Sequence, residues 1–177
     1  MSASSEGVAN ASSAKAAVTD KREILKLLRE RVNTDLATMQ AAQRTVVEGA
    51  THEENKPEND KDTRALEQSY LARGQAQRVV ELQGELNQLK ALELREFSAV
   101  TPIALGALVA IEDGKETVHY FIAPAGGGLR VALGGVEVRV VTPQSPIARA
   151  LLGKREGDDL ELRTPQSVTE CSIARVT

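Results

Sequence analysis

The feature that most constrains the fold is a pair of apolar stripes, spaced by threes and fours, on either side of a polar segment at 48–62. The first stripe follows Asp20 and Glu23, whose D-x-x-E pattern is typical of a helix start. A helix from Asp20 to Val47 would be about 40 Å long. This spacing predicts that one helix face is buried. The face comprises Ile24, Leu28, Val32, Leu36, Met39, Ala42 and Val46.

A second stripe after the polar segment predicts a second long helix. Leu82, Leu86 and Leu89 alternate in steps of four and three, which is the spacing of a coiled-coil seam. Because the segment 48–62 is charged and contains turn residues, we expect the two helices to fold back as an antiparallel hairpin in which each buries the other's stripe. The second stripe comprises Leu66, Tyr70, Ala76 or Gln77, Val79 or Val80, Leu82, Leu86, Leu89 and Leu92.

The composition changes near Phe97, after which short apolar segments are bounded by turn residues. Asp113-Gly114 between two such segments predicts a β-hairpin, and Ser145-Pro146 predicts the start of one short helix at 147–152. We therefore predict an α+β fold: a long antiparallel α-helical coiled-coil hairpin followed by a small, mostly antiparallel β-rich domain with one short helix. The expected strands are 108–112, 117–123, 136–141, 159–164 and 168–176.

The domain organisation follows from these patterns. Residues 1–18 are rich in Ser and Ala and lack the basic start and apolar stretch of a secretory signal, so we expect a disordered tail there. The coiled coil should occupy 19–97, with an acidic tip at 48–62. The C-terminal domain should occupy 98–177.

The charge and cysteine content limit the partners. The net charge is −3, from 22 basic and 25 acidic residues, which gives no electrostatic reason to bind free nucleic acid. Any nucleic-acid contact should therefore be indirect, through a partner protein. The single cysteine, Cys171, favours a reducing compartment, and no apolar run approaches the roughly 20 residues that span a bilayer. We expect a monomeric cytoplasmic protein without a membrane partner.

Two stretches of the sequence carry a resemblance to a known family. The first is Ser-Pro-Ile-Ala-Arg-Ala-Leu-Leu-Gly-Lys at 145–154, followed by Gly157-Asp158-Asp159. The second is Glu58-Asn59, followed by Glu67-Gln68 and Gly74. Their order over most of the chain resembles the bacterial Gre-type (GreA/GreB) transcription elongation factors, with the stronger match in the C-terminal stretch.

The resemblance implies a division of labour. The C-terminal domain, with a fold like that of the FK506-binding proteins, would dock at the rim of the secondary channel of bacterial RNA polymerase, and the coiled coil would enter that channel. The tip acids Glu58 and Asp60 would help the polymerase to cleave backtracked RNA. The chain would thus be a regulator and not an enzyme. The expected polymerase-binding residues are Ser145, Pro146, Ile147, Arg149, Lys154 and Arg155.

The cofactor implied by the resemblance is the Mg²⁺ of the polymerase active site, which Glu58 would share; the chain would have none of its own. Mg²⁺ prefers carboxylate oxygens, and two such ions can stabilise both oxygens of a phosphoryl displacement. The sequence departs from the family's cleavage-competent tip at Asn55, where that tip has Asp, and at Pro57. An amide brings no negative charge. Two alternatives therefore stay open: stimulation of cleavage, or occupation of the channel without cleavage.

Other interpretations compete with these. Asn55-Lys56-Pro57-Glu58 fits a helix cap, so Glu58 could be structural. By fold analogy alone the C-terminal domain could be a prolyl isomerase, although it offers only Phe97, Tyr120 and Phe121 as aromatic walls. A structural coiled-coil adaptor that dimerises through its helices is a third possibility. Cys171, in an alternating strand pattern, is expected to be a buried, inert thiol.

Overall fold

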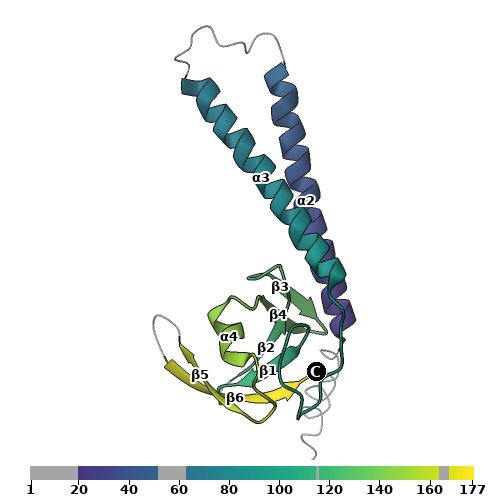
Figure 1. The fold of residues 1–177 in the computed structure, drawn as a ribbon, viewed down its shortest axis with the longest axis vertical. Helices are drawn as coiled ribbons and strands as arrows, with labels where there is room; N and C mark the ends of the chain where they lie inside the picture. Colours follow the sequence, from purple (N-terminus) through teal and green to yellow (C-terminus); the bar gives the residue numbers. More distant parts are fainter. Residues whose placement is uncertain (1–19, 52–62, 115, 164–167) are drawn as a thin grey trace, which may run out of the picture. The chain divides into compact units, whose positions relative to one another are not determined.

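The computed structural model describes residues 20–51, 63–114, 116–163 and 168–177. The chain divides into two compact units: the helical segment Arg29–Asn87, and a second unit that combines 20–28 with Gln88–Thr177. The predicted α+β class is confirmed (Figure 1). In chain order the elements are α2 (Lys21–Thr51), α3 (Thr63–Ala91), β1 (Leu108–Glu112), β2 (Thr117–Ile122), β3 (Arg130–Leu133), β4 (Val136–Val141), α4 (Pro146–Leu151), β5 (Asp159–Arg163) and β6 (Val168–Val176).

Helix α2 begins where the sequence predicts and ends later. Asp20 Oδ1 accepts hydrogen bonds from the backbone N–H groups of Arg22 (3.0 Å) and Glu23 (3.3 Å), which satisfies donors that a helix start leaves without partners. The helix continues to Thr51, past the predicted end at Val47. A polar composition does not by itself end a helix, and the one glycine on the way costs only about 1 kcal/mol.

The helical unit has the predicted hairpin form, with α2 and α3 side by side and running in opposite directions (Figure 1). Its interior is apolar at the end that is farther from the segment between the helices. Val32 and Leu36 of α2 are buried, as are Val79, Leu82 and Leu86 of α3. The heptad spacing therefore identified the seam of the hairpin correctly in this half.

The burial of α3 settles two positions that the stripe left open. Val79 is buried whereas Val80 is 62% exposed. Ala76 is partly buried whereas Gln77 is exposed. Leu92, counted in the predicted stripe, lies beyond the end of the helix at Ala91.

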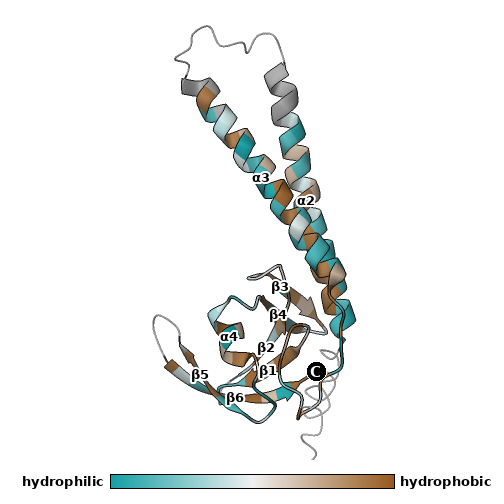
Figure 2. Ribbon diagram, in the orientation of Figure 1, coloured by the Kyte–Doolittle hydropathy of each residue, from teal (hydrophilic) through white to brown (hydrophobic). Residues whose placement is uncertain are grey.

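The first half of α3 contradicts the predicted stripe. Leu66 and Tyr70 are 53% and 68% exposed. Steps of three and four residues back from the buried Val79 lead to Ala76 and Gln75, which therefore lie on the inward face of α3. The helical period places Leu66 and Tyr70 on the outward face. The Gln75 Oε1 atom is buried without a hydrogen-bond partner among the described residues. Figure 2 shows hydrophobic and hydrophilic residues interspersed along both helices.

This difference predicts a contrast between two leucines of α3. Replacing Leu82 with Ala should destabilise the helical unit by about 2–5 kcal/mol, because it leaves a cavity in the seam. Replacing Leu66 with Ala should change the stability by less than about 0.5 kcal/mol, because the side chain already meets solvent. Urea unfolding followed by circular dichroism measures both values. Equal losses would contradict the observed seam.

The sheet has six strands in the order β3-β4-β2-β1-β6-β5. All neighbours are antiparallel except β2 and β4, which pair in parallel from His119↔Val138 to Ile122↔Val141. The prediction of a mostly antiparallel sheet is confirmed, with this one parallel pair as an addition. The chain passes from β2 to the edge strand β3 and then back to β4, which lies between them. Because it reverses direction twice on this path, β4 runs parallel to β2.

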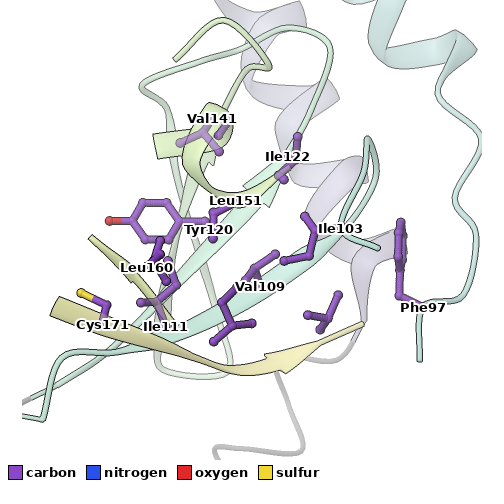
Figure 3. Packing of buried hydrophobic residues seen from close by; sticks show 14 residues of the cluster. Phe97, Ile103, Val109, Ile111, Tyr120, Ile122, Val141, Leu151, Leu160 and Cys171 are labelled. Carbon is purple, nitrogen blue, oxygen red and sulfur yellow. The ribbon is translucent and has the colours of Figure 1, made fainter. Parts of the chain in front are cut away.

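The main core lies between the sheet and α4 (Figure 3). Val109, Tyr120 and Ile122 point into it from the central strands, and Leu151 closes it from the helix. The helix begins at Pro146, one residue before the predicted start. The other buried members of the cluster are Phe97, Ile103, Ala107, Ile111, Val141, Ala148, Leu160, Cys171, Ile173 and Val176.

The sheet-containing unit also includes the first turns of α2 and the end of α3. Ile24, Leu28 and Leu89 are fully buried. A Cβ atom added to Gly126, in the loop before β3, would lie 2.9 Å from Leu28 Cδ1. The base of the helical pair is therefore packed as part of this unit.

The compact units divide the chain differently from the predicted domains. The boundaries fall at Leu28/Arg29 and Asn87/Gln88, within the helices, whereas the predicted boundary was 97/98. Residues 92–98 have no regular secondary structure. The predicted tail at 1–18 lies outside the described residues.

Candidate functional site

The predicted docking segment begins at a capped helix start. Ser145 has φ −68° and ψ 147°, and its Oγ accepts a hydrogen bond of 3.1 Å from the backbone N–H of Ala148. Pro146 occupies the first turn, where a missing N–H costs nothing. Local sequence therefore fixes the position of α4: Ser and Pro are the residue types that this geometry favours.

Helix α4 divides its side chains between core and solvent. Ala148 and Leu151 are fully buried, and Ile147 is partly buried against the same core. Pro146 and Arg149 are exposed. Of the predicted docking residues on α4, these last two present most of their surface to a partner, while Ile147 also supports the fold.

The structure separates the roles of the three predicted basic residues. Arg155 Nε donates a 2.9 Å hydrogen bond to the carbonyl of Val100, and Lys154 Nζ donates one of 2.9 Å to the carbonyl of Asp159. The side chain of Arg149 makes no hydrogen bond or ion pair within the described ranges 20–51, 63–114, 116–163 and 168–177, and only its backbone N–H donates, to the carbonyl of Ser145 (3.0 Å). Of the three basic side chains, that of Arg149 is therefore the one whose charged group is exposed and left without an intramolecular partner in the described ranges.

The loop after α4 pairs with the segment before β1. The Gly153 N–H donates to the carbonyl of Ile103 (2.9 Å), and the Ile103 N–H donates to the carbonyl of Lys154 (2.8 Å). The backbone N–H of Arg155 donates to Asp158 Oδ2 (2.8 Å). Sequence reasoning did not identify Val100 or Ile103, because such pairing between distant backbone segments leaves no local pattern.

A hollow of about 850 Å³ is lined by residues of β1, α4, β5 and β6 and of the loops that follow β1 and α4. In the described part of the chain, none of its lining residues is aromatic. Phe97, Tyr120 and Phe121 are all buried. The aromatic walls that the isomerase alternative requires are therefore not at this hollow. Its lining consists of Glu112, Asp113, Gly114, Ala150, Lys154, Asp159, Leu160, Glu161, Glu170, Cys171 and Ser172.

Burial in the fold shifts the pKa values of the Cys171 thiol and the His119 ring. Cys171 is buried, as predicted, and burial, together with the nearby Asp113 carboxylate, raises the pKa of its thiol. The thiol therefore stays protonated and unreactive at neutral pH. His119 is partly buried, and burial lowers its pKa, which favours the neutral ring.

The predicted tip residues Asn55, Glu58 and Asp60 lie outside the described residues. The helices that flank them end at Thr51 and begin at Thr63. Within the described ranges, no group of three or more His, Cys, Asp or Glu residues is placed to hold a metal ion. The same part of the chain contains no helix that is long and apolar enough to cross a membrane.

A helical hairpin and a six-stranded sheet with one capped helix define a two-module α+β protein. A family model described as "Transcription elongation factor, GreA/GreB, C-term" matches residues 99–177, which include the sheet and α4. The chain belongs to the GreA/GreB family of transcription elongation factors. Its class is therefore regulatory and not enzymatic.

Two curated relatives support this assignment over most of the chain. The transcription elongation factor GreA of Halorhodospira halophila is 32% identical over 121 residues, covering 67% of this chain and 71% of the relative. GreA of Xanthomonas campestris pv. campestris is 30% identical over 133 residues, covering 74% and 78%. Among solved structures, the GreA factor homolog 1 (Gfh1) of Thermus thermophilus is 21% identical, with a TM-score of 0.36, covering 84% of this chain and 94% of that one.

Proposed function

We propose that this elongation factor binds bacterial RNA polymerase through its sheet-containing unit and inserts its helical hairpin into the secondary channel. The observation that supports the proposal is the solvent-exposed face of α4. Pro146 and Arg149 face solvent on a helix fixed by the Ser145 cap, within the segment that the family model matches. An exposed, unpaired arginine on a rigid element is suited to recognise carboxylates of a protein partner.

The hairpin suits a narrow channel. Helix α2 has 31 residues, which corresponds to about 46 Å. A pair of helices is thin, and its seam around Leu82 and Leu86 stiffens the half that is continuous with the sheet-containing unit. Such a structure can carry the acidic tip at 48–62 to a site that a globular domain cannot enter.

At the tip we propose that Glu58, aided by Asp60, helps to hold a second Mg²⁺ in the polymerase active site. That ion would stabilise charge as a water attacks the RNA backbone, while the polymerase itself carries out the hydrolysis. The factor would need no cofactor of its own. It would act as a monomer in the cytoplasm and meet nucleic acid only within the transcription complex.

The second candidate function is occupation of the channel without cleavage. Asn55 favours it, because an amide at this position supplies a neutral oxygen where a carboxylate would supply charge. The isomerase alternative has no supporting site, since the aromatic side chains of the sheet-containing unit are buried. The adaptor alternative predicts an obligate dimer that does not bind polymerase, which light scattering and co-purification distinguish.

Reversing the charge of Arg149 should weaken polymerase binding. Arg149→Glu should lower the affinity for core RNA polymerase about tenfold or more, because an exposed guanidinium is replaced by a repelled carboxylate. Arg175→Glu is the matched control: it makes the same charge change at another exposed arginine, on β6, and should bind within about twofold of the unmodified chain. Fluorescence anisotropy with a labelled factor measures both affinities. Equal affinities for the two variants would reject α4 as the docking element.

A further inference from the structure

We infer that Lys21 and Arg155 are positioning residues which fasten the segment 92–103, here called the strap, and so connect the docking loop after α4 to the base of the helical pair. The inference rests on the proposed function, because it assigns a consequence to docking at α4. The strap runs from the end of α3 towards β1. It lies, with both of its fasteners, in one compact unit.

The first fastening is a buried ammonium group. Lys21, in the first turn of α2, is only 5% exposed. Its Nζ donates a hydrogen bond of 2.5 Å to the carbonyl of Arg95 and lies 5.0 Å from the centre of the Phe97 ring. The guanidinium of Arg95 lies 4.9 Å from the same ring. Burying a lysine is unfavourable unless its charge is compensated, so these contacts to the strap are the compensation that the fold provides.

The environment of Lys21 agrees with this role. Burial lowers the pKa of its ammonium group, the nearby Arg95 lowers it further, and Glu96 raises it. Lys21 is withdrawn from solvent, which removes it from the residues that a partner could contact. Its first-turn position links the strap directly to α2.

The second fastening lies beside α4. The hydrogen bond from Arg155 Nε holds the carbonyl of Val100, whose side chain is 77% exposed. Burial therefore does not hold residue 100 in place, and the hydrogen bond does. The backbone pairing of Ile103 with Gly153 and Lys154 continues the connection to the docking loop.

Between the contacts with Lys21 and Arg155, the strap contains two hydrogen bonds of its own. The Thr101 N–H donates to the carbonyl of Ser98 (2.9 Å), and the Ser98 N–H donates to Thr101 Oγ1 (3.2 Å). These bonds form a closed turn in the middle of the strap. A displacement of the docking loop is therefore passed to the first turn of α2 instead of being absorbed. The strap thus connects the docking loop to the first turn of α2, a helix that is continuous from Lys21 to Thr51.

The experiment compares Lys21→Met and Arg155→Met in the full chain. Methionine keeps the length of an apolar stem but removes the donor, and replacing a buried charge with a similar apolar group is often tolerated by the fold. Arg175→Met is the matched control for the change at an exposed arginine, and Lys21→Arg keeps a cation at the first fastening. Amide hydrogen exchange over 92–103, measured by mass spectrometry, reports the strap without any partner. Titration with core RNA polymerase reports the affinity and, separately, the effect on transcription at saturation.

Both methionine variants should exchange at least fivefold faster over 92–103 than the unmodified chain. Lys21→Met should also keep its polymerase affinity within about twofold while its effect at saturation falls at least fivefold. Arg175→Met should match the unmodified chain in every readout, and Lys21→Arg should recover most of the protection.

Unchanged exchange in both methionine variants would overturn the fastening. Faster exchange with a full effect at saturation would overturn the coupling. If the unmodified chain did not bind polymerase, the proposed function would fail, and the coupling with it, whereas hydrogen exchange would still decide whether the strap is fastened. A Lys21→Met chain that failed to fold would leave Arg155→Met and Lys21→Arg to decide the fastening.

Discussion

Replacing Asn55 with Asp should increase cleavage of backtracked RNA by polymerase bound to this factor about tenfold. The reason is that Mg²⁺ binds carboxylate oxygens strongly, and a second charged ligand beside Glu58 would hold the second ion more tightly. The assay uses a stalled complex with end-labelled RNA and measures the rate at which the transcript shortens at saturating factor. Asn55→Ser, which stays neutral, is the matched control and should not accelerate cleavage.

The companion change is Glu58→Ala, which should lower cleavage about tenfold or more by removing the remaining metal ligand. The same reactions separate the two proposed modes of action. Slower RNA synthesis without any shortening in the unmodified chain would favour channel occupation. Equal cleavage by the unmodified chain, Asn55→Asp and Glu58→Ala would remove the tip from the mechanism.

The largest stability effect outside the core leucines is expected at Gly126. This residue has φ +76°, and an added Cβ would lie 2.9 Å from Leu28 Cδ1. A left-handed backbone costs alanine about 1–2 kcal/mol, and overpacking against a fully buried leucine adds about 1–3 kcal/mol. Gly126→Ala should therefore lower the free energy of unfolding by about 2–5 kcal/mol, measured by urea unfolding of the full chain.

Gly128 provides the control for the backbone contribution. It has φ +87° and nothing within 4 Å of an added Cβ, so Gly128→Ala should cost only about 1–2 kcal/mol. In a Leu28→Ala background the Gly126→Ala change should fall to that same value, because the clashing methyl group is gone. Equal costs for the two glycine changes in the unmodified background would show that α2 does not press on this loop.

Much of this protein follows from local patterns. Asp20 and Glu23 predict the start of α2, and Asp20 does cap it. The steps of Leu82 and Leu86 predict the seam of the hairpin. Ser145 and Pro146 predict the start of α4 to within one residue. Each signal is contained in a few neighbouring residues, since caps and helix periods depend only on short-range geometry.

The basic residues near α4 show that local patterns do not predict which side chains have partners within the fold. Arg149, Lys154 and Arg155 look alike in sequence, yet only Arg149 has a side chain without a partner in the described ranges. The other two bond to carbonyls, in the case of Arg155 to one at Val100. Lys21 gave no sequence signal and is buried against Phe97. These roles depend on which distant backbone lies within hydrogen-bond reach.

The sequence by itself therefore determined the two helices, one half of their seam, five of the six strands and the capped helix α4, together with the family resemblance, while β3 (Arg130–Leu133) was not among the expected strands. Only the tertiary structure decided that Leu66 and Tyr70 face outward, that β2 and β4 run parallel, and that the base of α2 belongs with the sheet. The physical reason is the distance along the chain between the residues that interact. Periodicity and capping are properties of adjacent residues, whereas burial, register and hydrogen bonds between segments depend on which parts of the chain meet after folding.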